Sequence, residues 1–397
     1  MHLFINSLAA SAGGGLTYIR NVIPHLVAAP DVRLTVALSP GLRDEFNHFG
    51  QVEFIELDVP ASRRFFYEQA VLPGIIRKQA ADILLSAGNF ALRKSPVPQI
   101  LLSRNSLYTS EDFFHDLSSR REYRIWFETR LKGMIARRSI DWAAVTVAPS
   151  EAFADELRSW TSGKRAMAIH HGFDHDAFSA DVSPLAPEVD EKLRAAGDGL
   201  KLLFVSHYNY YRNFETLISA LPLVRKLLAP RPIRLLLTCK LSPGSNPGTY
   251  NTESAARLAN RLGVSGMICE LGTIPYGQLH QLYRQADIYV TPAYTETFAH
   301  PLVEAMSCGL PVAASDLPVH REICDEAALY FPRFSAQELA SCVADIATSP
   351  ERYAHLSAQG LKRAAVFSWR KHVDSLLALA HSLLVTRSSL TSVERSA

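Results

Sequence analysis

The sequence has little of what marks several large classes of protein. Its five cysteines are odd in number and include no Cys-x-x-Cys pair, so they indicate reduced thiols rather than a disulfide framework. A formal net charge of +2 argues against a nucleic-acid binder that relies on bulk electrostatics. No apolar run approaches the roughly 18 residues of a spanning helix. The first residues lack the basic and apolar regions of a secretion signal, so we expect a cytoplasmic protein.

What the chain does have is a repeated alternation of strand-like and helix-like segments over 397 residues. Such alternation predicts an α/β fold with two doubly wound parallel-sheet domains. The predicted strands are 2–6, 33–38, 52–57, 82–86, 99–103, 144–148 and 165–170, then 201–206, 233–239, 267–271, 288–291, 312–314 and 328–330. We assign residues 1–170 to the first domain, 171–199 to an exposed connector and 200–368 to the second domain, with a frayed tail at 386–397.

Two glutamates, Glu296 and Glu304, with seven residues between them, stand in a strand, loop, helix and strand pattern over residues 291–323. Pro301 fits the first turn of the predicted helix and Gly309 fits its end. Glu296 is therefore expected on the loop after a strand, where open α/β sheets bind ligands, and Glu304 about one turn into the helix. The plainer alternative is a solvated helix face with an N-terminal dipole partner.

The letters around these glutamates, from Glu296 to Asp316, resemble the signature of retaining GT-B glycosyltransferases of the glycosyl transferases group 1 family, the family 4 type. The resemblance implies two Rossmann-like domains that face a cleft, with a C-terminal crossover helix at 369–385 on the first domain. It implies that Glu296, with the amides around Phe298, Ala299 and His300, holds the donor sugar, and that Glu304 binds the ribose. The family usually has glycine at Ala299, and alanine should serve there if its φ is negative.

The start of the second domain resembles the family's phosphate-binding segment. The resemblance places Arg212 at a cation position beside the diphosphate, just before Asn213, a good N-cap. Ser206 and His207 replace the usual Gly-Arg pair, and Lys240 is the candidate for a further cation. Thr273 lies in a Gly-Thr-Ile turn that resembles the family's segment beside the nucleobase, although a plain strand-to-helix turn explains it equally well.

In the first domain, Gly14 and Gly15 follow the first strand and resemble the family's Gly-Gly loop, whose amides approach a phosphate or sugar. A dinucleotide fingerprint fits poorly, because Tyr18 stands where its third glycine belongs, and a turn without a ligand stays open. On the acceptor side, the strand 99–103 leads into Arg104 and Asn105, where the family usually has a histidine. The leaving phosphate, or a group from elsewhere, then has to accept the proton.

We expect no metal and no cofactor. The acidic pair Asp174 and Asp176 resembles a metal motif of another glycosyltransferase fold, but divalent oxygen sites usually need more carboxylates. The histidines lack zinc-site spacing.

Residues 118–139 form a predicted helix with seven basic and two acidic residues between aromatic and aliphatic ones. Such a helix is typical of peripheral association with the inner face of a membrane. The alternative is an amphipathic domain helix whose arginine stems cover apolar surface.

The resemblance as a whole implies a retaining, metal-independent hexosyltransferase. It would move a sugar from a UDP- or GDP-linked donor to a hydroxyl of a glycan or lipid-linked glycan, in cell-envelope polysaccharide or lipopolysaccharide biosynthesis. A nucleotide-sugar epimerase of the same architecture and a non-catalytic nucleotide-sugar-binding subunit are the alternatives.

Overall fold

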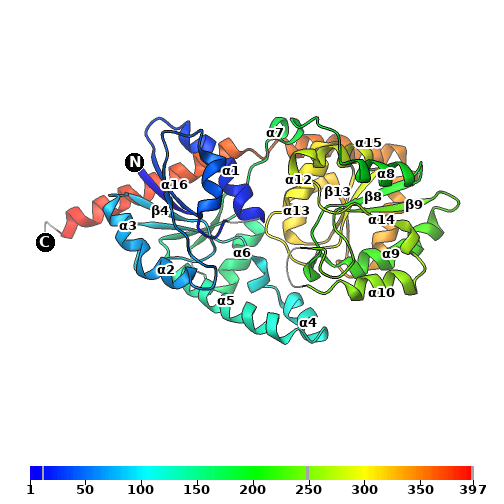
Figure 1. Ribbon diagram of the computed structural model, residues 1–397, viewed down its shortest axis with the longest axis horizontal. Coiled ribbons are helices and arrows are strands. Elements are labelled where there is room, and N and C mark those ends of the chain that lie inside the picture. Colours follow the sequence, from blue (N-terminus) through cyan, green and yellow to red (C-terminus); the bar gives the residue numbers. More distant parts are fainter. Residues whose placement is uncertain (11–12, 164, 247–249, 395–397) are drawn as a thin grey trace. The chain divides into compact units, whose positions relative to one another are not determined.

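Two parallel β-sheets organise the chain, one in each of two units (Figure 1). The computed structural model describes residues 1–10, 13–163, 165–246 and 250–394. Unit 1 comprises residues 1–109, 122–172 and 368–397, and unit 2 comprises residues 110–121 and 173–367. Within the described ranges, no helix combines the length and the apolarity needed to cross a bilayer.

The sheet of unit 1 has seven parallel strands in the order β3-β2-β1-β4-β5-β6-β7. Most of its strands are buried along their whole length, as expected where helices cover both faces of a parallel sheet. The strands are β1 (His2–Asn6), β2 (Arg33–Leu38), β3 (Glu53–Glu56), β4 (Ile83–Ser86), β5 (Gln99–Leu102), β6 (Val145–Ala148) and β7 (Ala166–Ala168).

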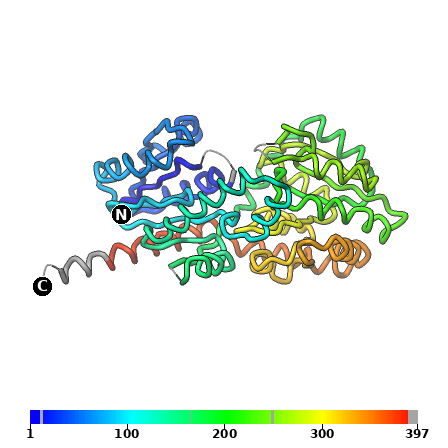
Figure 2. Tube along the Cα trace, turned by 90° about the horizontal axis from the view of Figure 1, so that it is seen from below, coloured from blue at the N-terminus to red at the C-terminus, as the bar shows by residue number. Residues whose placement is uncertain are grey.

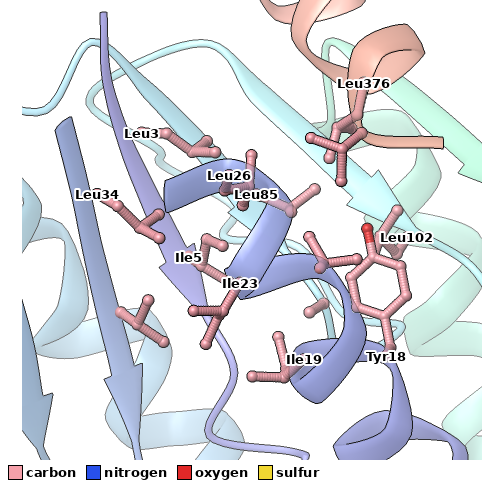
Figure 3. Close-up of a cluster of buried hydrophobic side chains, with 14 of the residues drawn as sticks. Leu3, Ile5, Tyr18, Ile19, Ile23, Leu26, Leu34, Leu85, Leu102 and Leu376 are labelled. Atoms are coloured by element: carbon pink, nitrogen blue, oxygen red, sulfur yellow. The ribbon is translucent and has the colours of Figure 1, made fainter. Parts of the chain in front are cut away.

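The last helix, α16 (Trp369–Glu394), packs against the core of unit 1 although unit 2 precedes it in the sequence. Its Val373, Leu376 and Ala380 are buried in the cluster that also holds Tyr18 and Ile23 of the first helix, and Figure 3 shows Leu376 beside this cluster. The red segment of α16 can be followed along unit 1 in Figure 2. The other helices of unit 1 are α1 (Gly13–Val27), η1 (Pro40–Phe46), α2 (Arg64–Ala70), α3 (Leu72–Lys78), η2 (Ser106–Tyr108), α5 (Tyr123–Trp142) and α6 (Glu151–Trp160).

The sheet of unit 2 has six parallel strands in the order β10-β9-β8-β11-β12-β13. They are β8 (Leu200–Phe204), β9 (Ile233–Leu237), β10 (Ile268–Glu270), β11 (Ile288–Thr291), β12 (Val312–Ser315) and β13 (Ala328–Phe331). Its helices are α4 (Glu111–Ser119), α7 (His175–Ser179), α8 (Pro187–Ala195), η3 (Tyr210–Arg212), α9 (Phe214–Leu227), α10 (Glu253–Arg261), η4 (Ser265–Met267), η5 (Tyr276–Gln278), α11 (Leu279–Gln285), α12 (His300–Ser307), α13 (Pro318–Cys324), η6 (Asp325–Ala327), α14 (Ala336–Thr348) and α15 (Pro350–Ala364).

Both sheets share one topology, in which the strand order reverses beside the first strand of the unit. In unit 1 the reversal lies between β1 and β4, and in unit 2 between β8 and β11. This is the doubly wound Rossmann-like arrangement, so the prediction of two such domains is confirmed. In this arrangement, each unit is expected to bind a ligand at the carboxyl ends of these strand pairs.

The structure departs from the sequence prediction in three segments. The predicted helix over 118–139 is wrong as one helix, because Arg121 takes a left-handed φ of 60° and separates α4 from α5. The segment 171–199 contains α7 and α8, whose Phe178 and Leu193 are buried, where an exposed connector was expected. Finally, α16 continues to Glu394, whereas the pattern placed a frayed tail from residue 386, and residues 395–397 lie outside the described part.

Candidate functional site

The loops at the strand-order reversal of unit 2 carry two of the predicted site residues. Arg212 ends η3, which follows β8, and Glu296 lies in the loop that follows β11. Because β8 and β11 are parallel neighbours, their carboxyl ends meet at one edge of the sheet. The structure therefore brings Arg212 and Glu296 together at the place where open α/β sheets bind ligands.

Arg212 and Glu296 form an ion pair, in which Nη1 of the guanidinium donates to Oε2 of the carboxylate. Both side chains are largely buried, with 18% and 12% of their surface exposed. Burial alone would lower the pKa of Arg212, but the adjacent Glu296 raises it above its ordinary value. The Nε atom of Arg212 has no hydrogen-bond partner among the described residues. A buried guanidinium that keeps its charge and has donors to spare can bind an anion such as phosphate.

Asn213 holds together the loops around this pair. Its left-handed backbone, with φ of 56°, begins α9, and its side chain accepts from the amide of Thr216 at 3.4 Å. Its Nδ2 donates to the carbonyls of Pro292 at 3.0 Å and Arg333 at 2.7 Å. The predicted N-cap is therefore present, and the side chain also joins the loops after β8, β11 and β13. The sequence pattern gave no signal for this second role.

The helix that follows Glu296 begins with strained backbone. Ala299, the residue before α12, has φ of 64° and ψ of 62°. The condition under which alanine was expected to serve there, a negative φ, is not met, and the glycine usual in the family would fit this left-handed conformation better. Phe298 is buried against Phe367, with ring centroids 5.3 Å apart, and His300 is the first residue of α12. The backbone of residues 298–300 thus leads into the N-terminus of α12.

Glu304 lies one turn into α12, as its position in the sequence indicated. Its side chain is only 3% exposed, and Oε2 accepts a hydrogen bond of 2.7 Å from the hydroxyl of Tyr283 on α11. Burial raises the pKa of the Glu304 carboxyl to about 7, and the Tyr283 hydrogen bond opposes this rise only in part. The Glu304 carboxyl thus lies in an enclosed place, with the Tyr283 hydroxyl as its hydrogen-bond donor.

The other predicted donor-site residues of unit 2 lie on exposed loops. His207 follows β8, Thr273 follows β10, and both are exposed. Lys240 follows β9, where its backbone bonds to Asn246 and its Cε lies 3.4 Å from the position of a Cβ on Gly272. In the described part of the chain, the contacts of Lys240 do not include the Arg212–Glu296 pair.

Helix α4 binds the same loops of unit 2, although both flanking segments of the chain belong to unit 1. Asp116 accepts hydrogen bonds from the hydroxyl of Tyr294 at 2.8 Å and from Arg120 at 2.7 Å. Arg120 also pairs with Glu215 of α9 at 2.9 Å. Tyr294 lies two residues before Glu296, and its amide donates to the carbonyl of Tyr211, the neighbour of Arg212. Helix α4 therefore supports both loops that carry the ion pair.

In unit 1, Arg104 braces the start of α1. Its Nη1 donates to the carbonyl of Gly14 at 3.0 Å, its Nη2 donates to Ala87 at 2.6 Å, and its guanidinium lies over the ring of Tyr18. Gly15 approaches the Cα of Ala10 so closely that a Cβ would lie 3.1 Å from it. These residues meet beside the strand-order reversal of unit 1.

Asn105 of unit 1, one of the predicted acceptor-side residues, caps a short helix. The Oδ1 of Asn105 accepts from the amide of Leu107 at 3.1 Å, so it caps η2.

Glu68 on α2, which sequence analysis missed, is 5% exposed and interacts with Asn6 at the carboxyl end of β1. Burial raises the pKa of Glu68 to about 7. Nothing in the local sequence marks Glu68, because its burial depends on packing against β1.

Of the acidic pair Asp174 and Asp176, Asp174 has a structural role. Asp174 caps α7, where its side chain accepts from the amide of Ala177 at 3.0 Å. Within the described ranges, no group of three or more histidine, cysteine or acidic side chains is arranged to hold a metal ion.

Two family models match the chain. The model described as glycosyl transferases group 1 matches residues 186–363, and the model described as glycosyltransferase family 4 matches residues 12–177. The D-inositol 3-phosphate glycosyltransferase of Mycolicibacterium smegmatis is 29% identical over 63% of this chain and 56% of its own length. That of Rhodococcus erythropolis is 27% identical over 53% of this chain and 50% of its own length. The chain thus spans about half the length of the curated relatives it matches.

Solved structures resemble the chain over almost its whole length. Sucrose-phosphate synthase from Thermosynechococcus elongatus aligns with a TM-score of 0.74 at 19% identity, over 97% of this chain and all of that one (100%). HepE from Anabaena, in complex with UDP, aligns with a TM-score of 0.70 at 17% identity, over 96% and 99%. These likenesses identify the GT-B fold. The two matched models, which between them cover residues 12–177 and 186–363, show that this chain belongs to the glycosyl transferases group 1, of the GT-B family 4 type.

Proposed function

We propose that this protein transfers a sugar from a nucleoside-diphosphate sugar to a hydroxyl of a glycan acceptor, with retention at the anomeric carbon. The bond between the anomeric carbon and the β-phosphate oxygen breaks, and its electron pair goes to the diphosphate. The acceptor oxygen forms the new bond to the anomeric carbon on the same face and loses its proton. The second product is the nucleoside diphosphate.

The observation that carries this proposal is the buried Arg212–Glu296 pair at the strand-order reversal of unit 2. A diphosphate bound there would compete with Glu296 for the guanidinium of Arg212, and Glu296 would then be free to accept from sugar hydroxyls. Charge develops on the diphosphate as the glycosidic bond breaks, so Arg212 stabilises the transition state more than the ground state. Amides at 298–300, before and at the start of α12, are the further donors we assign to the sugar.

Glu304 is the residue we assign to the ribose. Its carboxylate already accepts from Tyr283, and ribose hydroxyls would supply the additional hydrogen bonds that a buried carboxylate requires. Such bonds stabilise the ionised form, so we expect nucleotide binding to lower the pKa of Glu304 below its value of about 7 in the free protein.

The acceptor's proton goes to the departing diphosphate in this proposal. The position after β5, where the family usually has a histidine, holds Asn105, whose Oδ1 caps η2 and which does not titrate. With attack on the leaving-group face, the diphosphate oxygen lies beside the acceptor hydroxyl and serves as its base, without a metal and without a further side chain.

The donor we test first is UDP-linked, because HepE, a neighbour in fold, was solved with UDP and with UDP-glucose. For the acceptor we propose a glycan or lipid-linked glycan of the cell envelope, since another neighbour, WaaG, is described as involved in lipopolysaccharide biosynthesis. We also propose that the protein works in the cytoplasm, because all five of its cysteines are free thiols.

A thermal-shift screen with UDP, GDP and ADP tests the nucleotide site. A ligand at about 100 times its dissociation constant should stabilise the protein by about 2.7 kcal/mol. Glu304→Ala should abolish most of this shift, whereas Glu338→Ala, at the exposed start of α14, should leave it unchanged. An unchanged shift in Glu304→Ala would remove Glu304 from the site.

Incubation of the protein with a panel of nucleotide sugars and glycan acceptors then identifies the reaction. Release of nucleoside diphosphate with a glycosylated acceptor supports the proposal. An isomerised nucleotide sugar would instead identify an epimerase, and binding without turnover would identify a non-catalytic subunit. Analysis of the product's anomeric configuration by NMR decides between retention and inversion.

A further inference from the structure

Four large apolar side chains form a row on the exposed face of α5 in unit 1. Tyr123, Phe127, Leu131 and Met134 are 64%, 65%, 46% and 61% exposed. Their spacing of four, four and three residues places them in one line along the helix. Single exposed apolar residues are common on protein surfaces, but a continuous row is typical of an interaction site. Figure 1 shows α5 along the lower edge of unit 1.

The opposite face of α5 is fixed against unit 1, so the row cannot turn inward. Small residues allow this close packing: a Cβ on Gly133 would lie 3.5 Å from Cβ of Tyr108 and 3.9 Å from the ring of Trp160. The buried residues of the helix are Thr129, Gly133, Ala136, Ser139 and Ile140. Helix α5 is thus packed on one face, and its apolar row is exposed because it lies on the other face.

Basic side chains border the apolar row. Five of them on α5 are exposed, namely Arg124, Arg130, Lys132, Arg137 and Arg138, against two exposed acids, Glu128 and Asp141. One acid is shared between two of the bases, because Glu128 accepts from Arg124 at 3.0 Å and lies 4.0 Å from Lys132. The face therefore carries an excess of positive charge, which would repel a second copy of the same face and attract an anionic surface.

We propose that this face of α5 binds the surface of an anionic lipid bilayer. The row of Tyr123, Phe127, Leu131 and Met134 enters the boundary between headgroups and acyl chains, while the flanking arginines and lysine pair with lipid phosphates. A straight helix of 20 residues is about 30 Å long and presents this pattern along a line, which suits a flat surface. The inference rests on α5 alone and is independent of the sugar-transfer reaction proposed above.

Flotation of the full-length chain with lipid vesicles tests this proposal. Wild-type protein should bind phosphatidylcholine vesicles that contain phosphatidylglycerol, more weakly as salt rises, and should bind pure phosphatidylcholine far less. Replacement of Lys132, Arg137 and Arg138 by glutamine should lower partitioning about fivefold for each charge that reaches the surface. The double variant Phe127→Ser with Met134→Ser should lower it at least about tenfold, because it removes apolar area that the bilayer would bury.

Matched changes in unit 2 serve as controls. Arg225, Lys226 and Arg257 are exposed bases of α9 and α10, and Leu227 is a 50% exposed apolar residue. Their replacement by glutamine or serine should leave vesicle binding unchanged. No binding by the wild type at low salt, or an equal loss in the control variants, overturns the proposal. A dimer in sedimentation velocity that the Phe127→Ser, Met134→Ser variant abolishes would also overturn it, because a second copy would then cover the row.

Discussion

Arg212 and Glu296 form an ion pair across 84 residues of sequence, and each lies in the segment that follows one of two adjacent strands, β8 and β11. Both side chains are too buried for water to solvate their charges fully, so in the free protein each charge is stabilised by the other. A bound diphosphate would replace Glu296 as the partner of Arg212. The pair is thus a stable resting arrangement for two residues that meet different parts of one donor in our proposal.

Replacement of Arg212 by alanine should lower turnover by about a hundredfold or more while leaving the preference among donor sugars almost unchanged. Its charge would act on the diphosphate, which all donors share, and would matter most as the glycosidic bond breaks. Steady-state kinetics with two donor sugars measure both effects. Arg321→Ala, which breaks an exposed arginine–carboxylate pair with Asp316, is the matched control and should keep full turnover. Full turnover in Arg212→Ala would mean that another cation stabilises the charge on the diphosphate.

The positions of the strands could be predicted from the sequence because the central strands are buried on both faces. Runs such as those of β1, β2 and β11 are apolar along most of their length and are bounded by charged or turn-forming residues, and their ends were predicted at the residues where the structure places them. Asn213 was recognised as an N-cap for a similar local reason, since its side chain bonds within its own helix. Local chemistry decides these features.

Features that depend on distant partners were not predictable. The break at Arg121 has no glycine or proline to mark it, and α4 is held on unit 2 by Tyr294, which is 178 residues from its partner Asp116. The left-handed φ of Ala299 was likewise unexpected, because the β11–α12 loop imposes it on a residue that does not favour it. In each case the contacts of the folded chain outweigh local propensity.

Ala299→Gly should stabilise the protein by about 0.5–1 kcal/mol. Relief of the left-handed strain, about 1–2 kcal/mol, exceeds the entropy that glycine adds to the unfolded chain. Thermal unfolding measures the change. Ala305→Gly, in the interior of α12, should act in the opposite direction by about 1 kcal/mol or more. A destabilising Ala299→Gly would mean that the methyl group of Ala299, which is 6% exposed, contributes more by packing than its backbone loses by strain.

Glu304→Gln should stabilise the protein increasingly as pH rises. Burial raises the pKa of the Glu304 carboxyl from 4.5 to about 7. The folded state favours the protonated carboxyl. Relative to higher pH, its contribution to the free energy of unfolding is therefore fully present below about pH 4.5 and is lost as pH rises through about 7. Glutamine does not titrate, and the variant should gain on the order of 2 kcal/mol over the wild type between about pH 5 and pH 8.

Thermal unfolding of both proteins across this pH range measures the difference for Glu304. Glu338→Gln, at an exposed helix start, is the control and should show a flat difference. A flat difference for Glu304→Gln as well would mean that the carboxyl ionises in the folded protein as readily as in the unfolded one.

Gly172→Ala should destabilise the protein by more than about 3 kcal/mol. Gly172 is the last residue of unit 1 before the chain enters unit 2, and a Cβ there would lie 2.0 Å from the backbone nitrogen of Trp369. Backbone atoms cannot yield as a side chain would, so the segments would have to separate. Gly74→Ala in α3, where a Cβ would meet nothing within 4 Å, should instead be neutral or slightly stabilising. Comparable thermal stability of the two variants would contradict this prediction.

Removal of the carboxylates that anchor α4 should release this helix from unit 2. Asp116 accepts from Tyr294 and Arg120, and Asp112 pairs with Arg333 at 2.7 Å, so Asp112→Asn with Asp116→Asn weakens three charged contacts at once. Hydrogen exchange followed by mass spectrometry should show faster exchange in residues 110–121 and in the loop around Tyr294, with α5 unchanged. Glu128→Gln, which breaks an exposed pair on α5, should alter neither segment. Unchanged exchange in the double variant would show that the contacts left intact, namely the Arg120–Glu215 pair and the buried Phe113 and Leu117, are enough to hold α4 in place.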